Sequence, residues 1–434
     1  MLKIKVGLTK NPRFEPLIEG TVKSAKLHLD TVVTTPPELF FRNLKNDEFD
    51  VFEMSLSEYL ITREQAKGDR WNWAALPIFP AKAFVWLGFY VNTAAGIAGL
   101  ADFRGKRIGV PDYVMTAALW FRIFLRELHG IQAQEISWFI GRTPELSHGG
   151  VLGADVKPRG VSPTWLTAAQ TFDVMLDRGE IDAAYGFAPR HDPKLFKLNI
   201  DRYGGTPLEG NPRLEKLFAD GGWSVIEAFF KKTGMVPANH VIVAQRRLLQ
   251  ENSWLAGELY QIFDASKQTA YERTNYGSPA YLYFESNDRQ TQAKTFGDDP
   301  FPFGLSKNRP MLEMLFANSH AEGLTRKRAQ IEEVFFPSLL DTSTEREECS
   351  WRIRFLPSTP TATSKKATSI GATAYPTTQE PGARKKTERQ RSTANHHRRQ
   401  SVAPARRLGY RRRRSLQPAP STSSRNDRSK AAAG

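Results

Sequence analysis

The sequence predicts a two-lobed α/β protein with a central cleft, followed by a disordered basic tail. Short apolar runs rich in β-branched residues alternate with helical patterns, this alternation begins a second time after a proline-rich interruption, and the composition changes abruptly after Thr342. We therefore divide the chain into a first lobe of residues 1–86 and 236–342, a second lobe of residues 87–235, and a tail of residues 343–434.

Charge also separates the tail from the rest of the chain. The formal net charge is +15, and the tail contains 21 Lys and Arg residues against 6 Asp and Glu residues, whereas residues 1–342 contain 40 of each sign. The tail retains too few large apolar residues to offset an ordering cost of roughly 1–2 kcal/mol per residue. One interpretation is a nuclear-localisation or nucleic-acid-binding arm built on Arg411–Arg414, and the other, which we favour, is a solvated appendage. We do not expect nucleic acid to be a partner of residues 1–342.

Cysteine content and hydropathy restrict the compartment and the chemistry. The single cysteine, Cys349, lies in the tail, so residues 1–342 cannot form a disulfide, a thiolate nucleophile or a cysteine-ligated metal site. The segment Met1–Leu8 predicts a strand and is not followed by the apolar run of about 7–15 residues that a secretory signal needs. No stretch approaches the ~18–20 apolar residues that span a bilayer. We expect a cytoplasmic protein with no membrane partner.

The strands and helices follow from the hydrophobic periodicity. The predicted strands are Lys3–Leu8, Phe49–Met54, Phe84–Val91, Arg107–Val110, Ile181–Tyr185 and His240–Ala244. The predicted helices are Pro37–Leu44, Thr116–Leu128, Thr167–Asp177, Pro212–Leu217, Ser253–Tyr271 and Asn308–Asn318. Alternation of this kind is typical of a parallel sheet, and ligands of such sheets bind beyond the carboxyl ends of the strands, here in the cleft between the lobes.

Several segments resemble a known family. The most specific are Phe49–Ser57, FDVFEMSLS, and Gly105–Ala118, GKRIGVPDYVMTAA; the weaker ones are GEIDA at Gly179–Ala183, TGMVPANH at Thr233–His240 and GLSKNR at Gly304–Arg309. In this order, over about residues 1–340, they resemble the 4,5-dihydroxyphthalate decarboxylases. The resemblance implies a type 2 periplasmic-binding-protein-like fold that serves decarboxylation in the cytosol. The tail has no counterpart in that family.

One segment departs from the family pattern. The family commonly has PSRxFRH where this chain has PAKAFVW at Pro80–Trp86. Lys82 keeps one positive charge, whereas Val85 and Trp86 replace an arginine and a histidine. Because lysine cannot reproduce the bidentate contact of arginine with a carboxylate, the identity of the substrate is left open.

The implied reaction requires proton transfer and charge stabilisation. In 4,5-dihydroxyphthalate each carboxyl group has a hydroxyl para to it, so the ring can act as its own electron sink and no organic cofactor is predicted. A divalent metal stays open, although His28, His129, His148, His191 and His320 show no metal-ligand spacing. The protein must supply a base for the phenol, an acid for the ring carbon and cations for the carboxylates.

The catalytic candidates are Glu53, Lys82 and His240. Glu53 lies near the carboxyl end of an apolar strand, where it is either a general base, an ion-pair partner of Lys82, or a residue that points to the outer face. Histidine has an unperturbed pKa of ~6.5, which suits proton transfer. A structural role for His240, and a solvated loop position for Lys82, are the alternatives.

The substrate-binding candidates lie near helix starts and strand ends. Thr116 is predicted to cap a helix whose free N–H groups hold a carboxylate, with Tyr113 as a neighbouring wall or donor. Ser55 and Ser57 are expected to act similarly from the first lobe, and Tyr185 ends a predicted strand. Ordinary capping is the alternative for the serine and threonine side chains.

Two classes of function remain open. The favoured function is decarboxylation of a hydroxylated aromatic carboxylate, and the alternative is a non-catalytic solute-binding or sensor protein for a small carboxylate. A pyrimidine-precursor synthase of the thiamine pathway is disfavoured, because residues 1–342 lack the CCCFC pattern of those enzymes. The sequence leaves the oligomeric state open.

Overall fold

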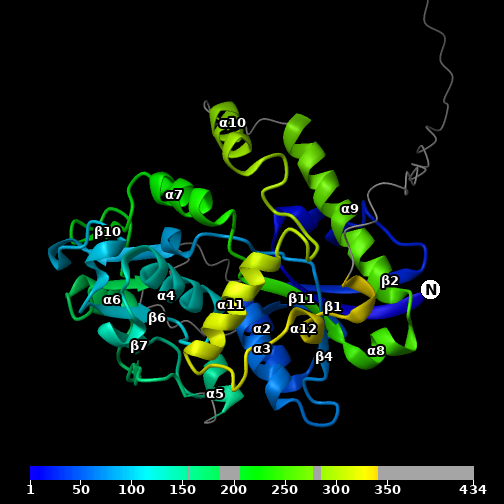
Figure 1. The fold of residues 1–434 in the computed structure, drawn as a ribbon, viewed down its shortest axis with the longest axis horizontal. Helices are drawn as coiled ribbons and strands as arrows, with labels where there is room; N and C mark the ends of the chain where they lie inside the picture. Colours follow the sequence, from blue (N-terminus) through cyan, green and yellow to red (C-terminus); the bar gives the residue numbers. More distant parts are fainter. Residues whose placement is uncertain (154–156, 186–205, 277–284, 341–434) are drawn as a thin grey trace, which may run out of the picture. The chain divides into compact units, whose positions relative to one another are not determined.

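The protein contains two β-sheets covered by helices (Figure 1). The computed structural model describes residues 1–153, 157–185, 206–276 and 285–340, so the predicted tail lies outside the described residues. The predicted α/β class is confirmed by these two sheets. Within the described residues, no helix is both long enough and apolar enough to cross a membrane. The cytoplasmic location stays a prediction.

The first sheet has five strands in the order β2-β1-β3-β11-β4. Their bounds are β1 Leu2–Thr9, β2 Leu27–Thr34, β3 Val51–Ser55, β4 Trp73–Leu76 and β11 His240–Gln245. Strand β1 is parallel to β2 and β3, but β11 is antiparallel to both of its neighbours. The prediction of a parallel sheet does not hold for β11, which enters the sheet from the end at which β3 leaves it. His240 pairs with Ser55 as a result.

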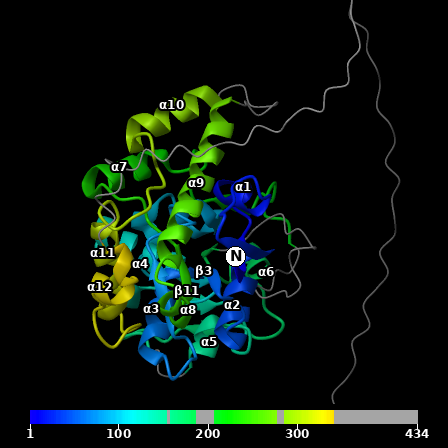
Figure 2. The same ribbon diagram turned by 90° about the vertical axis from the view of Figure 1, so that its right-hand side faces the viewer.

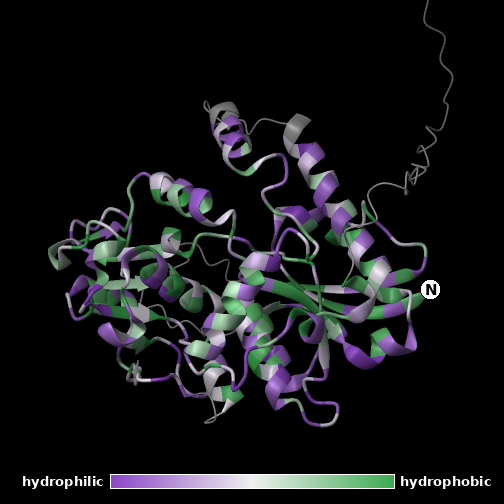
Figure 3. Ribbon diagram, in the orientation of Figure 1, coloured by the Kyte–Doolittle hydropathy of each residue, from purple (hydrophilic) through white to green (hydrophobic). Residues whose placement is uncertain are grey.

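Helices cover both faces of the first sheet. One face, with Phe52 and Val243, packs in a core that includes residues of α2 (Pro36–Asn46) and α3 (Leu56–Gln65). The other face packs against α9 (Leu255–Tyr276), as Figure 2 shows. Burial on both sides explains why β3 is apolar without alternation. Figure 3 shows the hydrophobic residues concentrated along these strands.

The second sheet has six strands in the order β10-β5-β9-β6-β7-β8. Their bounds are β5 Phe89–Asn92, β6 Arg107–Val110, β7 Ser137–Ile140, β8 Thr164–Trp165, β9 Ala183–Tyr185 and β10 Leu214–Lys216. Strands β9, β6, β7 and β8 are parallel, whereas β5 is antiparallel to both of its neighbours, β9 and β10. The helix predicted at Pro212–Leu217 is wrong, because β10 pairs with β5. The strand predicted at Phe84–Val91 begins late, because Val85–Gly88 form a 3₁₀ helix.

The remaining predicted helices are present with shifted ends. Helices α2, α4 (Thr116–His129) and α11 (Arg309–Ala321) agree with the predictions to within a few residues, whereas α6 (Phe172–Asp177) begins five residues late. The others are α1 Glu15–Ile18, α5 His148–Leu152, α7 Trp223–Thr233, α8 Arg246–Glu251, α10 Glu285–Phe296 and α12 Ile331–Val334. The first sheet takes strands from residues 2–76 and 240–245, and the second from residues 89–216. The lobe boundaries at residues 86 and 235 stay a prediction.

A buried histidine joins α5 to the helices of the first sheet. The Nδ1 atom of His148 lies 2.9 Å from both carboxylate oxygens of Glu58 in α3, and its Nε2 lies 3.0 Å from the carbonyl oxygen of Pro37 in α2. Both ring nitrogens lie within hydrogen-bonding distance of oxygen atoms, so this one side chain links α5 to α2 and to α3. The two side chains are almost fully buried, at 1% and 0% exposed.

We expect His148→Ala to destabilise the protein by about 3–5 kcal/mol, because the change leaves the Glu58 carboxylate buried without its partner. Denaturant unfolding measures the loss. The control is His28→Ala, which removes an exposed histidine from β2 and should change the free energy of unfolding by less than about 0.5 kcal/mol. If both substitutions lowered the free energy of unfolding by the same small amount, the stabilising role of the contact between His148 and Glu58 would be contradicted.

Candidate functional site

A carboxylate and an imidazole meet where β3 ends and β11 begins. Glu53 Oε1 lies 2.6 Å from His240 Nδ1. Glu53 is opposite Ile242 in the ladder, so His240, two residues earlier in β11, lies on the same face of the sheet and is a diagonal neighbour of Glu53. We call Glu53 and His240 the Glu–His pair. Glu53 is fully buried, so the outer-face alternative is wrong.

The end of β1 fixes the other carboxylate oxygen. Glu53 Oε2 accepts hydrogen bonds from the backbone N of Thr9 at 3.0 Å and from its Oγ1 at 2.7 Å. Burial by itself would raise the pKa of Glu53, but the hydrogen bond and charge of His240, with the two donors of Thr9, outweigh it and lower the pKa. Glu53 is therefore an ionised carboxylate at neutral pH. Because a carboxylate only accepts hydrogen bonds, His240 Nδ1 carries a hydrogen.

The other nitrogen of the His240 ring, Nε2, is not used in the contact with Glu53. The His240 side chain is 17% exposed, in contrast to Glu53, and no described residue is hydrogen-bonded to its Nε2. The edge of the Phe40 ring packs on the imidazole, with ring centroids 4.9 Å apart. A histidine held at Nδ1 by a carboxylate, with Nε2 available, can accept and donate a proton.

Three hydroxyl-bearing residues meet beside the pair. Ser55 Oγ lies 2.9 Å from Thr116 Oγ1, which also accepts a hydrogen bond of 2.8 Å from the backbone N of Ser57. Helices α3 and α4 both begin here, and a helix start favours anions. Thr116 is the first residue of α4 rather than its cap, which is Met115, so the predicted cap is wrong by one residue. Ser57 Oγ is buried and has no hydrogen-bond partner within the described residues.

Lys82 does not pair with Glu53, so that alternative is wrong. Its Nζ instead donates to Asn308 Oδ1 at 2.7 Å, and Asn308 is fixed by donating its Nδ2 hydrogens to the carbonyl groups of Pro302 and Gly304. Burial is the main cause that lowers the pKa of Lys82 to about 7; the charge of Asp299 opposes this shift, and the charge of the nearby Lys267 adds to it. The backbone of Lys82 forms an isolated antiparallel β-bridge with Ala238, which lies two residues before His240.

The two predicted tyrosines lie in the second sheet region. The Tyr113 ring packs against the Arg122 guanidinium, whose carbon lies 3.8 Å from the ring centroid, and is roughly perpendicular to the Trp138 ring, with ring centroids 5.7 Å apart. It does not contact Ser55 or Thr116 by any hydrogen bond of the described residues, and its buried hydroxyl has no partner there. Tyr185 packs against the Phe89 ring at the end of β9.

The two residues that depart from the family pattern are part of a buried core. Val85 and Trp86 are 2% and 1% exposed, and the Trp86 ring packs against Phe124 and Phe84 with centroids 4.5 and 5.1 Å apart. Where the family has an arginine and a histidine, this chain therefore has two hydrophobic side chains in a hydrophobic environment. Neither residue contributes a charge to the Glu–His pair.

Sequence reasoning missed Thr9, Arg13 and Asn308 as site residues. Thr9 anchors Glu53, Arg13 Nη2 donates to the Pro80 carbonyl at 2.6 Å, and Asn308 binds Lys82. Thr9 and Arg13 follow the first predicted strand, so the strand-end rule contained a signal for them. No local pattern identifies Asn308, because its partner is 226 residues away.

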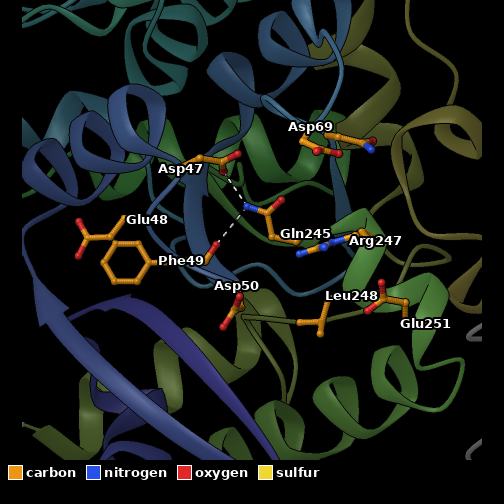
Figure 4. Close-up of a pocket in the computed structure, with 10 residues that line it drawn as sticks. Asp47, Glu48, Phe49, Asp50, Asp69, Gln245, Arg247, Leu248 and Glu251 are labelled. Carbon is orange, nitrogen blue, oxygen red and sulfur yellow. Dashed lines mark hydrogen bonds between the residues drawn. The ribbon is translucent and has the colours of Figure 1, made fainter.

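A separate cavity of about 290 Å³ lies at the other end of these strands, where β3 begins and β11 ends (Figure 4). Gln245, at the far end of β11, donates there to Asp47 and to the carbonyl of Phe49. The lining residues are Asp47, Glu48, Phe49, Asp50, Asp69, Asn72, Gln245, Arg247, Leu248 and Glu251. None of the predicted site residues lines it. Among the described residues, no group of three or more His, Cys, Asp or Glu side chains could hold a metal ion.

Comparisons with known proteins define the class and then the family. The fold and the Glu–His pair describe an α/β protein in which a carboxylate and an imidazole meet at strand ends. The chain is 31% identical over 343 residues to a 4,5-dihydroxyphthalate decarboxylase of Comamonas testosteroni, covering 79% of this chain and 98% of the relative. A protein of the same name from Pseudomonas putida is 32% identical over 223 residues, covering 50% and 78%. The chain belongs to the 4,5-dihydroxyphthalate decarboxylase family.

Other comparisons are more distant. No protein-family model matches the chain. The periplasmic aliphatic sulphonate binding protein of Escherichia coli is similar in structure over 78% of this chain and 99% of its own, with a TM-score of 0.42 and 14% identity. The desulfurization enzyme DszB covers 77% of this chain and 97% of its own, with a TM-score of 0.38 and 13% identity.

The lowered pKa of Glu53 makes the effect of Thr9 depend on pH. A carboxylate with a lowered pKa in the folded state stabilises above its unfolded pKa of about 4.3, and this contribution is lost as the pH falls. We expect Thr9→Val to cost about 1.5–3 kcal/mol at neutral pH, and the difference from the unaltered protein to shrink in acid. Thermal unfolding across this pH range measures it. Thr93→Val, at an exposed threonine, is the control, and a pH-independent difference for Thr9→Val would contradict the account.

Proposed function

We propose that this protein decarboxylates a hydroxylated aromatic dicarboxylate, of which 4,5-dihydroxyphthalate is the best-supported example, to give 3,4-dihydroxybenzoate and carbon dioxide. The observation that carries the proposal is the Glu–His pair, in which a buried carboxylate holds a partly exposed imidazole 2.6 Å away. The names of the two curated relatives support the same reaction.

The chemistry of the substrate sets three requirements. Loss of a proton from a ring hydroxyl pushes electron density to the para carbon, which bears a carboxylate. Protonation of that carbon interrupts the aromatic ring. The bond from this carbon to the carboxylate then breaks, its electron pair returns to the ring, and aromaticity is restored as carbon dioxide leaves. The site must therefore hold a base, an acid and groups that bind carboxylates.

His240 is the proposed acid. As an imidazolium it donates the Nε2 proton to the ring carbon, and the Glu53 carboxylate at Nδ1 stabilises the charged form and orients the ring. The imidazole can then recover a proton from the solvent, because the His240 side chain is partly exposed whereas Glu53 is buried.

Lys82 is the proposed base for the ring hydroxyl. Its pKa of about 7 leaves a substantial fraction of neutral amine at physiological pH. Asn308 Oδ1 accepts a hydrogen bond from the amine without using its lone pair, so the lone pair can accept the hydroxyl proton. The resulting ammonium ion would lie near the phenolate that it has produced.

The starts of α3 and α4 are the proposed contact for a carboxylate. Ser57 Oγ is buried without a described partner, although buried hydroxyls are normally hydrogen-bonded. A ligand carboxylate would satisfy it and would exchange with the direct contacts between Ser55, Ser57 and Thr116. Helix N-termini are suited to that charge.

We expect the purified full-length protein to release carbon dioxide from 4,5-dihydroxyphthalate, and His240→Ala and His240→Asn each to lower kcat/KM at least tenfold. Asn retains a donor near the Nδ1 position for Glu53 but cannot transfer a proton from Nε2. His28→Asn, at an exposed site, is the matched control. Carbon dioxide release and product formation are measured together.

Unchanged turnover in both His240 variants would remove His240 from the mechanism. Tight binding of the dicarboxylate to the unaltered protein without product would instead favour the solute-binding alternative that the sequence leaves open.

A further inference from the structure

Arg13 is a partly buried cation near the Glu–His pair that the proposed mechanism does not use. It belongs to the 3₁₀ helix Pro12–Phe14, which follows the strand whose last residue, Thr9, anchors Glu53. Its Nη2 donates to the carbonyl of Pro80 at 2.6 Å, two residues before Lys82. The guanidinium is therefore attached to the segment that carries the proposed base and lies close in sequence to the anchor of the proposed acid.

The guanidinium has no carboxylate partner within the described residues. Its Nε is buried and makes no hydrogen bond there, and none of the ion pairs of the described residues includes Arg13. Burial lowers the pKa of Arg13, while Tyr271, Glu53 and Asp299 oppose the shift from a distance. A partly buried guanidinium with a buried, unpartnered Nε and no ion pair keeps charge and hydrogen-bonding capacity that an anion can satisfy.

The surroundings hold Arg13 in a fixed position. Its guanidinium carbon lies 3.8 Å from the centroid of the Phe301 ring, and its backbone is held by Asn11 Oδ1 and by the hydroxyl of Ser266 in α9. The backbone N of Phe301 donates to Asp299 Oδ1, so the aromatic platform is fixed too. A guanidinium fixed on an aromatic face is preorganised to bind a planar carboxylate by two parallel hydrogen bonds.

We propose that Arg13 binds the carboxylate that the reaction retains, and so selects an aromatic ring with two carboxylates over a ring with one. The inference rests on the proposed function for the identity of the ring. A bidentate ion pair stabilises a carboxylate and opposes its loss as carbon dioxide, so the group at Arg13 stays on the product. The second carboxylate, at the starts of α3 and α4, is the one that leaves.

The test compares binding of phthalate, benzoate and the neutral phthalamide to the full-length protein by calorimetry. Phthalate and benzoate lack the hydroxyl that the proposed reaction needs, so binding is measured without turnover. We expect the unaltered protein to bind phthalate at least tenfold more tightly than benzoate and phthalamide. Arg13→Gln should abolish this preference, and Arg13→Lys should restore only part of it.

The matched control is Arg273→Gln, which removes an arginine that pairs with Glu19 on the surface of α9 and should keep the preference. Thermal unfolding of each variant separates loss of binding from loss of folding. A folded Arg13→Gln protein that still prefers phthalate tenfold overturns the inference, as does an unaltered protein without the preference.

Parallel assays of carbon dioxide release keep the two proposals distinguishable. Release by the unaltered protein together with an unchanged preference in Arg13→Gln would contradict the role of Arg13 alone. A preference that depends on Arg13 without any release from 4,5-dihydroxyphthalate would contradict the decarboxylase proposal and leave Arg13 as a dicarboxylate-binding residue.

Discussion

The hydrogen bond between Glu53 and His240 is the interaction on which the rest of the site depends. A fully buried carboxylate inside a strand would be strongly unfavourable without partners, and here each oxygen has one: His240 on one side and Thr9 on the other. This requirement determines which strands must be neighbours. Strand β1 has to end beside β3, and β11 has to begin there, which is possible only because β11 runs antiparallel.

The other charged side chains of the site lie near the same strand ends. The chain that leaves β4 carries Pro80 and Lys82 past the start of β11, and the chain that leaves β1 carries Arg13 to Pro80. Asp299, held by Lys267 and Tyr271, offsets part of the positive charge through its field. The second sheet contributes the start of α4, where Thr116 meets Ser55 and Ser57. The site therefore combines strand ends from one sheet with a helix start from the other.

Much of this arrangement was predictable from local sequence. The strands of Glu53 and His240 and the start of α4 follow from hydrophobic runs, turn residues and the resemblance to a family. The pairings were not predictable, because Glu53 and His240 are 187 residues apart and Lys82 and Asn308 are 226 apart. Local patterns do not specify which strands meet or in which direction, and the parallel sheet was expected for that reason. The helix prediction at Pro212–Leu217 is wrong for the same reason: this segment forms a strand because it pairs with β5, and local sequence does not specify that pairing.

The most direct test of the central claim is the protonation of the His240 ring, measured by nitrogen NMR of the protein labelled at histidine and assigned with the His240→Asn variant. The account predicts that Nδ1 carries a hydrogen in a strong hydrogen bond whether the ring is neutral or charged, and that Nε2 alone exchanges its proton as the pH changes. Replacement of Glu53 by Gln should weaken the Nδ1 hydrogen bond. A neutral His240 ring protonated at Nε2 instead of Nδ1 would contradict the account.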